Sequence, residues 1–323
     1  MKIKPLGIRK KGKKASADDI KTPRKKRRLK YIAVLPSFIT LTNGAFGFMA
    51  IYFASRSQEL TLSFLFVRSS YLTSFALAGY MILLAMIADM LDGRVARLTR
   101  TTSSFGGQLD SLSDAISFGV APAFLMIKLV EFHMNNHVFD HLRFSILIWR
   151  GIIFAAILYV MCAVVRLARF NVENEEDGSK HMNFVGLPSP AAAGIIVSIV
   201  VMHQQLITKI STLAQNSYYN FELITIFALP AICFLAGILM VSRIRYPHLA
   251  NQLLRGKKTL ASLLAIFACG ILIVWNIQLT MLVGFCGFAL FGVFRWIIVS
   301  LAKKKPEPIV HADAQSPLRK KEE

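Results

Sequence analysis

Four aspartates in two pairs are the residues of this sequence best suited to do chemistry. Asp89 and Asp92 are three residues apart, and Asp110 and Asp114 are four apart, so each pair shares one face of a helix. No histidine or cysteine interrupts the set, which argues against zinc, whereas oxygen ligands suit magnesium, calcium or manganese. Metal ions held in this way could clamp a pyrophosphate and stabilise the attacking and leaving oxygens of a phosphoryl transfer.

The two pairs lie at the facing ends of two apolar segments. The first pair closes one segment and the second pair opens the next, so two antiparallel helices would bring four carboxylates to one border of a membrane. Acidic groups there are costly and usually functional. Gly93 and Gly106 would let the main chain approach a nucleotide, and Arg97 could neutralise phosphate charge. The alternative is that the aspartates only form salt bridges with Arg94, Arg97 and Arg100; two helix-face pairs with glycines between them argue against it.

The composition is that of a membrane protein. Of 323 residues, 54% are hydrophobic and 17% charged, against about 25% charged in soluble domains. We therefore predict an all-α polytopic membrane helix bundle with about eight transmembrane helices. The predicted spans lie near residues 32–54, 71–91, 108–130, 147–167, 189–207, 222–242, 259–277 and 280–301.

The net charge of +20 is concentrated at the two ends of the chain. Residues 1–31 hold 14 of the 38 lysines and arginines, and residues 303–323 hold six more. Basic ends beside membrane spans are typical of cytoplasmic segments near anionic lipid, and no recognition fold or stacking aromatics suggest a nucleic-acid partner. The loops after the second, fourth and sixth predicted spans are also basic, which predicts that both termini are cytoplasmic.

The spacing of the aspartates is also recognisable. The pattern Asp-x2-Asp-Gly-x2-Ala-Arg-x8-Gly-x3-Asp-x3-Asp, from Asp89 to Asp114, resembles the signature of the CDP-alcohol phosphotransferase family at every fixed position. The resemblance implies a core of six membrane helices, a homodimer, and two divalent ions, magnesium or manganese. It implies Asp114 as the general base. The implied metal ligands are Asp89, Asp92, Asp110 and Asp114, and the implied CDP and phosphate pocket includes Gly93, Ala96, Arg97 and Gly106.

Two further segments resemble the phosphatidylserine synthase branch of that family. They are Arg-Leu-Ala-Arg-Phe-Asn-Val at 166–172 and Phe-Val-Gly-Leu-Pro-Ser-Pro-Ala at 184–191. Two other interpretations stay open: the arginines could only anchor a cytoplasmic helix end, and the Gly-Leu-Pro-Ser-Pro run could only be a rigid turn that opens the fifth span. The residues assigned to serine or phosphate binding are Arg166, Arg169, Asn171 and Ser189.

The first span carries the family's opening segment in modified form. The run from Pro36 to Gly47 resembles it and assigns Thr40 and Asn43 to the CDP and phosphate site, although Ser37 stands where asparagine is usual. The resemblance covers roughly residues 32–245. We therefore divide the chain into a basic N-terminal segment, 1–31, a phosphatidyltransferase domain, 32–245, a C-terminal pair of spans, 246–302, and a basic tail, 303–323.

The resemblance implies a transferase of phospholipid biosynthesis, and our expectation for its location is a bacterial inner (plasma) membrane, with the active site on the cytoplasmic side. The expected reaction moves the phosphatidyl group of CDP-diacylglycerol to L-serine. One alternative is the same chemistry with glycerol phosphate or inositol phosphate as acceptor, and another is an ion-coupled transporter, whose acids should lie at mid-bilayer. His133, His137 and His141 recur every four residues, and we interpret them as part of a surface helix, not a metal site.

Overall fold

The computed structural model describes residues 23–56, 73–99, 104–134, 145–176, 184–210, 215–246, 272 and 276–302. Side chains of the first helix are described from Ser37 onward. In chain order the elements are α1 (Pro23–Ser55), α2 (Ser74–Thr99), α3 (Ser104–Asp114), the π-helix η1 (Ala115–Val120), α4 (Ala121–His133), α5 (Ser145–Glu176), β1 (Phe184–Val185), α6 (Ser189–Ile210), α7 (Gln215–Val241), β2 (Arg245–Tyr246) and α10 (Ile277–Ala302).

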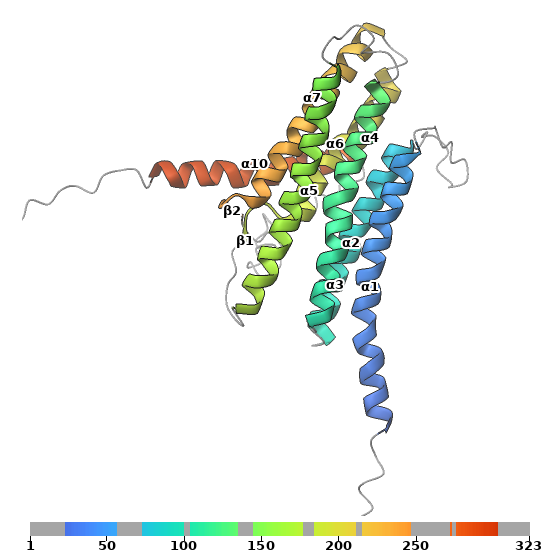
Figure 1. The fold of residues 1–323 in the computed structure, drawn as a ribbon, viewed down its shortest axis with the longest axis vertical. Helices are drawn as coiled ribbons and strands as arrows, with labels where there is room; N and C mark the ends of the chain where they lie inside the picture. The colour runs from blue at the N-terminus through green and yellow to red at the C-terminus, as the bar shows by residue number, and fades with distance from the viewer. Residues whose placement is uncertain are drawn as a thin grey trace, which may run out of the picture.

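Seven helical stretches in the described part of the chain are long and apolar enough to cross a membrane, which confirms the polytopic all-α bundle. They match seven of the eight predicted spans, and the predicted span 259–277 lies almost wholly outside the described residues. Figure 1 shows α10 crossing the other spanning helices at a steep angle. The stretches are Ser37–Ser55, Ser74–Val95, Phe105–His133, Ile146–Val172, Ser189–Ile207, Asn220–Val241 and Ile277–Leu301.

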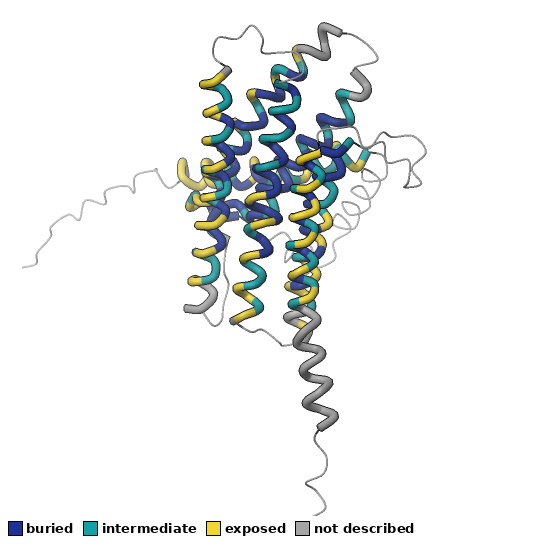
Figure 2. Tube along the Cα trace, turned by 45° about the vertical axis from the view of Figure 1, so that its right-hand side comes forward, coloured by how far each residue is buried: buried dark blue, intermediate teal, exposed yellow. Residues whose placement is uncertain are grey.

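Small side chains fill much of the space between the helices. Lipid tails are as apolar as leucine, so membrane helices associate through close packing, which small residues permit. The buried core accordingly includes Ala54, Ala78, Ala85, Ala163 and Ala192. Figure 2 shows buried positions turned toward the bundle interior and exposed positions along its outer faces. The exposed residues include many large apolar side chains, as expected of a surface that faces lipid.

A short two-stranded β-ribbon lies near the start of α6. Its first strand, β1, lies between α5 and α6, and its second strand, β2, follows α7. Phe184 pairs with Tyr246 and Val185 with Arg245, in antiparallel register. Gly186 follows with a φ of +91°, where a side chain would collide with the Met240 carbonyl, so glycine is required. The Gly-Leu-Pro-Ser-Pro run therefore bends at Gly186 and leads into α6, which begins at Ser189. β2 extends across the predicted domain boundary at residue 245.

A buried polar cluster corrects our interpretation of the histidines. His133 is buried at the end of α4, and its Nδ1 lies 2.8 Å from Oε1 of Glu222 on α7. Its ring also contacts the ring of His203 on α6. The surface-helix interpretation is wrong for His133, because α4 continues to the end of the span and faces two helices there. His137 and His141 lie outside the described residues.

Candidate active site

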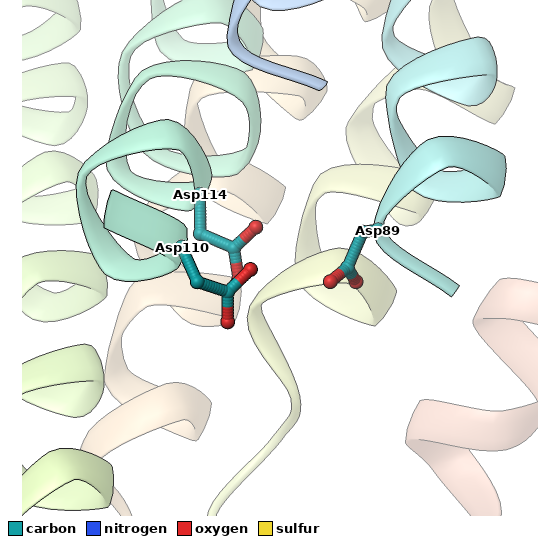
Figure 3. A group of neighbouring side chains, drawn as sticks. All are labelled: Asp89, Asp110 and Asp114. Carbon is teal, nitrogen blue, oxygen red and sulfur yellow. The ribbon is translucent and has the colours of Figure 1, made fainter. Parts of the chain in front are cut away.

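Three of the four aspartates converge between α2 and α3. Asp89, Asp110 and Asp114 each offer a carboxylate oxygen, and these oxygens all lie within 4.8 Å of one another. Asp110 and Asp114 lie one turn apart at the end of α3, and Asp89 faces them from α2 (Figure 3). The antiparallel arrangement expected from the sequence therefore brings these three side chains together. We refer to Asp89, Asp110 and Asp114 as the acidic triad.

Asp92 lies beside the triad but has its own partner. It is buried one turn after Asp89 and accepts a hydrogen bond from the Thr40 hydroxyl of α1. It remains close enough to influence Asp89 and Asp110 electrostatically. The structure thus divides the predicted set of four ligands into three converging carboxylates and one that is tied to α1.

Asn43 of α1 contacts the deepest member of the triad. Its Nδ2 donates to Asp114 Oδ1 at 2.9 Å, and both residues are buried. Its Oδ1 is also buried and has no hydrogen-bond partner among the described residues. The three carboxylates of the triad form an all-oxygen donor set, which fits a hard divalent cation, and the unpaired amide oxygen belongs to the residue that bonds to Asp114.

Arg166 of α5 supplies positive charge beside the triad. It is buried, and its Nη1 donates to Ser189 Oγ, at the start of α6, at 2.5 Å. Asp89 and Asp114 both lie within its electrostatic reach. Because clustered carboxylates repel one another in a poorly solvated site, a buried guanidinium is the counter-charge that such a cluster needs.

The family model for CDP-alcohol phosphatidyltransferases matches residues 33–228, a segment that contains the triad, Arg166 and Ser189. The chain belongs to the CDP-alcohol phosphatidyltransferase family. It is accordingly a multi-pass membrane enzyme, which decides against the transporter alternative. The family uses divalent metal ions in general, in agreement with the donor set described above.

Several relatives of this phosphatidyltransferase have names that include serine, either as the acceptor or as part of the product. A CDP-diacylglycerol–serine O-phosphatidyltransferase of Helicobacter pylori is 30% identical over 82% of this chain and 92% of its own length. One with the same name from Methanocaldococcus jannaschii is 36% identical over 56% of this chain and 67% of its own. An archaetidylserine synthase of Methanothermobacter thermautotrophicus is 32% identical over 69% of this chain and 73% of its own.

All four predicted serine-binding residues have hydrogen-bond partners within the protein: Arg166 and Ser189 bond to each other, and the other two bond elsewhere in the chain. Arg169 donates through Nη2 to the Val185 carbonyl of β1. Asn171 and Ser111 hydrogen bond to each other, with Asn171 Nδ2 and Ser111 Oγ 2.7 Å apart. Sequence reasoning missed Ser111, although it lies between two aspartates of the signature, because its partner is 60 residues away.

The predicted nucleotide-pocket residues lie along α2 and α3. Gly93 is exposed, and open space surrounds the position that a side chain would take there. Gly106 is half-buried in the first turn of α3. Ala96 and Arg97 belong to α2, but their side chains lie outside the described part of the chain. These four residues therefore lie on the same two helices as the acidic triad. Their contacts with a nucleotide stay predictions.

Proposed function

We propose that this enzyme transfers the phosphatidyl group of CDP-diacylglycerol to L-serine, which yields phosphatidylserine and CMP. The observation that carries the proposal is the acidic triad with Arg166 beside it, inside the segment that matches the phosphatidyltransferase family. The choice of serine is supported by the printed names of the relatives.

In this proposal Asp114 is the general base. It accepts the proton of the serine hydroxyl while the serine oxygen forms a bond to the phosphorus that carries the diacylglycerol. The bond from that phosphorus to the bridging oxygen of the pyrophosphate breaks, and CMP leaves with the electron pair. Phosphoryl transfer of this kind depends on positioning and charge stabilisation more than on covalent help from the protein. The bond from Asn43 Nδ2 orients the Asp114 carboxylate.

The metal ligands in this proposal are Asp89, Asp110 and Asp114, with Asn43 Oδ1 as a further oxygen donor. Magnesium or manganese fits these donors, and the cation would neutralise charge on the pyrophosphate when bound. Asp92 would act beside this site with Thr40 as its hydrogen-bond donor. A second ion and a homodimer are implied by the resemblance alone and stay predictions.

The serine carboxylate would bind near Arg166 and Ser189, because this guanidinium is buried beside the triad and can hydrogen bond to an anion. Arg169 and Asn171 would instead shape the pocket, since each already holds another part of the chain in place. Gly93, Ala96, Arg97 and Gly106 would line the cytidine and phosphate side. The distribution of basic residues favours a cytoplasmic active site, with both termini on that side of a bacterial plasma membrane.

CMP release by the purified protein tests the proposal. We expect release from CDP-diacylglycerol to require both L-serine and magnesium or manganese, and to stop when EDTA removes the metal. Glycerol phosphate and inositol phosphate, each at the same concentration, are the competing acceptors. Metal-dependent release with one of them but not with serine would keep the chemistry and overturn the substrate. Absence of release with every acceptor would overturn the proposed activity itself.

Thr40→Val tests whether Thr40 acts through Asp92 or contacts the nucleotide. Because the substitution removes the hydroxyl that Asp92 accepts from, we expect the metal concentration for half-maximal activity to rise about 10-fold. The KM for CDP-diacylglycerol should stay unchanged. Thr42→Val is the matched control, since the Thr42 hydroxyl bonds only to the Phe38 carbonyl of its own helix in the described structure. A raised KM for CDP-diacylglycerol with unchanged metal dependence would instead support the nucleotide role predicted from the sequence.

A further inference from the structure

The crossing of α1 with α3 and η1 is unusually close. A side chain at Gly47 would place its Cβ 2.8 Å from the Ser117 Cα, closer than atoms can approach. One turn earlier, a Cβ at Gly44 would lie 3.2 Å from the Ser113 Oγ. Gly44 and Gly47 belong to the opening segment of the family resemblance. Their small size lets α1 lie directly against the helix that carries Asp114.

Ser117 bonds across this crossing to Asn43, the residue of α1 whose side chain contacts Asp114. Its Oγ donates to the main-chain carbonyl of Asn43 at 2.9 Å, and the side chain is buried. The Asn43 side chain in turn donates to Asp114 at 2.9 Å. Asp114 and Ser117 are three residues apart on one helix, so that helix holds Asn43 at two points: its main chain through Ser117 and its side chain through Asp114.

The helix changes its geometry at this place. Asp114 is the last residue of α3, and the π-helix η1 follows from Ala115 to Val120. Such π-helical turns are rare and occur frequently at functional sites. Within η1, the carbonyl of Phe118 accepts a hydrogen bond at 2.9 Å from the hydroxyl of Tyr159, a fully buried residue of α5. Tyr159 lies seven residues before Arg166, which places both on the same face of α5.

We propose that Ser117 and Tyr159 are positioning residues that hold η1 between α1 and α5, and thereby fix the Asp114–Asn43 pair relative to Arg166. Neither hydroxyl touches the reacting atoms. Ser117 acts through Asn43, and Tyr159 acts through the main chain of η1. The inference rests on the proposed role of Asp114 as general base and adds two residues that the aspartate signature does not contain.

A double-mutant cycle with Ser117→Ala and Asn43→Ala tests the inference. We expect Ser117→Ala alone to lower kcat about 10- to 100-fold, because small misplacements of catalytic groups have effects of this size. The KM values for serine and CDP-diacylglycerol should stay within about threefold of wild type, since uniform substrate binding is unaffected. In the Asn43→Ala background the same substitution should cost less than about threefold, because the side chain that Ser117 positions is already gone.

Ser198→Ala is the matched control for the serine substitution. Ser198 is also buried, but its hydroxyl donates to the Ile195 carbonyl of its own helix, α6. We expect this variant to keep the wild-type kcat. Tyr159→Phe removes a single oxygen from the other side of η1 and should lower kcat about 10-fold, again without a change in KM.

Two results would overturn the inference: a wild-type kcat in folded Ser117→Ala, whatever its melting temperature, or effects of the two substitutions that multiply in the double mutant. If Ser117→Ala does not fold, Tyr159→Phe decides alone, and a wild-type kcat there overturns it. Failure of the proposed function can be told apart from failure of this inference. In that case the wild type would lack serine-dependent CMP release, or the Asp114→Asn variant would stay active.

Discussion

Asp114→Asn is expected to lower kcat for CMP release by about 100- to 10,000-fold, the range that general base catalysis contributes. Asparagine has nearly the same shape as aspartate but cannot take the proton of the serine hydroxyl. Its side-chain oxygen can still accept the hydrogen bond from Asn43 Nδ2, so the protein should fold. Steady-state CMP release with saturating serine and metal measures the loss, and the elution profile in detergent reports folding.

Glu131→Gln provides the control for this change of carboxylate to amide. Glu131 lies on the same continuous helix, where it pairs with Lys128 at 2.7 Å, and both side chains are partly exposed. We expect this variant to keep full activity, because exposed ion pairs contribute little. If Asp114→Asn retained more than about a tenth of the wild-type kcat, a smaller loss than general base catalysis predicts, another group would have to be the base.

Arg166→Gln is expected to lower kcat/KM for serine by about 100-fold, because truncating one partner of a buried charge cluster leaves the other charges uncompensated. The substitution removes the cation beside Asp89 and Asp114 and the hydrogen bond to Ser189. The loss should fall mainly on the KM for serine if Arg166 binds the serine carboxylate. Arg166→Lys keeps the charge without the planar fork of donors, so its activity should lie between those of the wild type and the glutamine variant.

Arg150→Gln is the matched control for the arginine substitution. Arg150 is an exposed residue on α5, outside the proposed site, and its loss should change neither kcat nor KM. If folded Arg166→Gln kept the wild-type KM for serine and lost only stability, Arg166 would be a structural counter-charge for the triad. If both Arg166 variants kept wild-type activity, the arginine would have no part in the reaction.

The spanning helices were predictable because each depends on local composition. About 20 apolar residues in a row suffice to cross a membrane, whatever the neighbours are. Seven of the eight predicted spans agree with helices of the described structure within a few residues. The meeting of Asp89 with Asp110 and Asp114 was predictable for a related reason, since a short connection forces α2 and α3 to lie antiparallel.

The histidine at the end of α4 shows where local reasoning failed. The spacing of His133, His137 and His141 is compatible with one exposed helix face, and nothing near them in the sequence suggests a buried partner. The partner of His133 is Glu222, which is 89 residues away on α7. Only the packing of α4 against α7 brings these two side chains together.

The sequence by itself determined the membrane class, the spans and the acidic residues, because hydropathy and helix-face spacing are properties of short segments. The tertiary structure decided which partner each polar group of the site has. It tied Thr40 to Asp92 and Asn43 to Asp114, across 52 and 71 residues. It also placed Arg166 beside the triad from a different helix. Such partners depend on how helices rotate and cross when they pack, and buried polar groups must find them because lipid offers no hydrogen bonds.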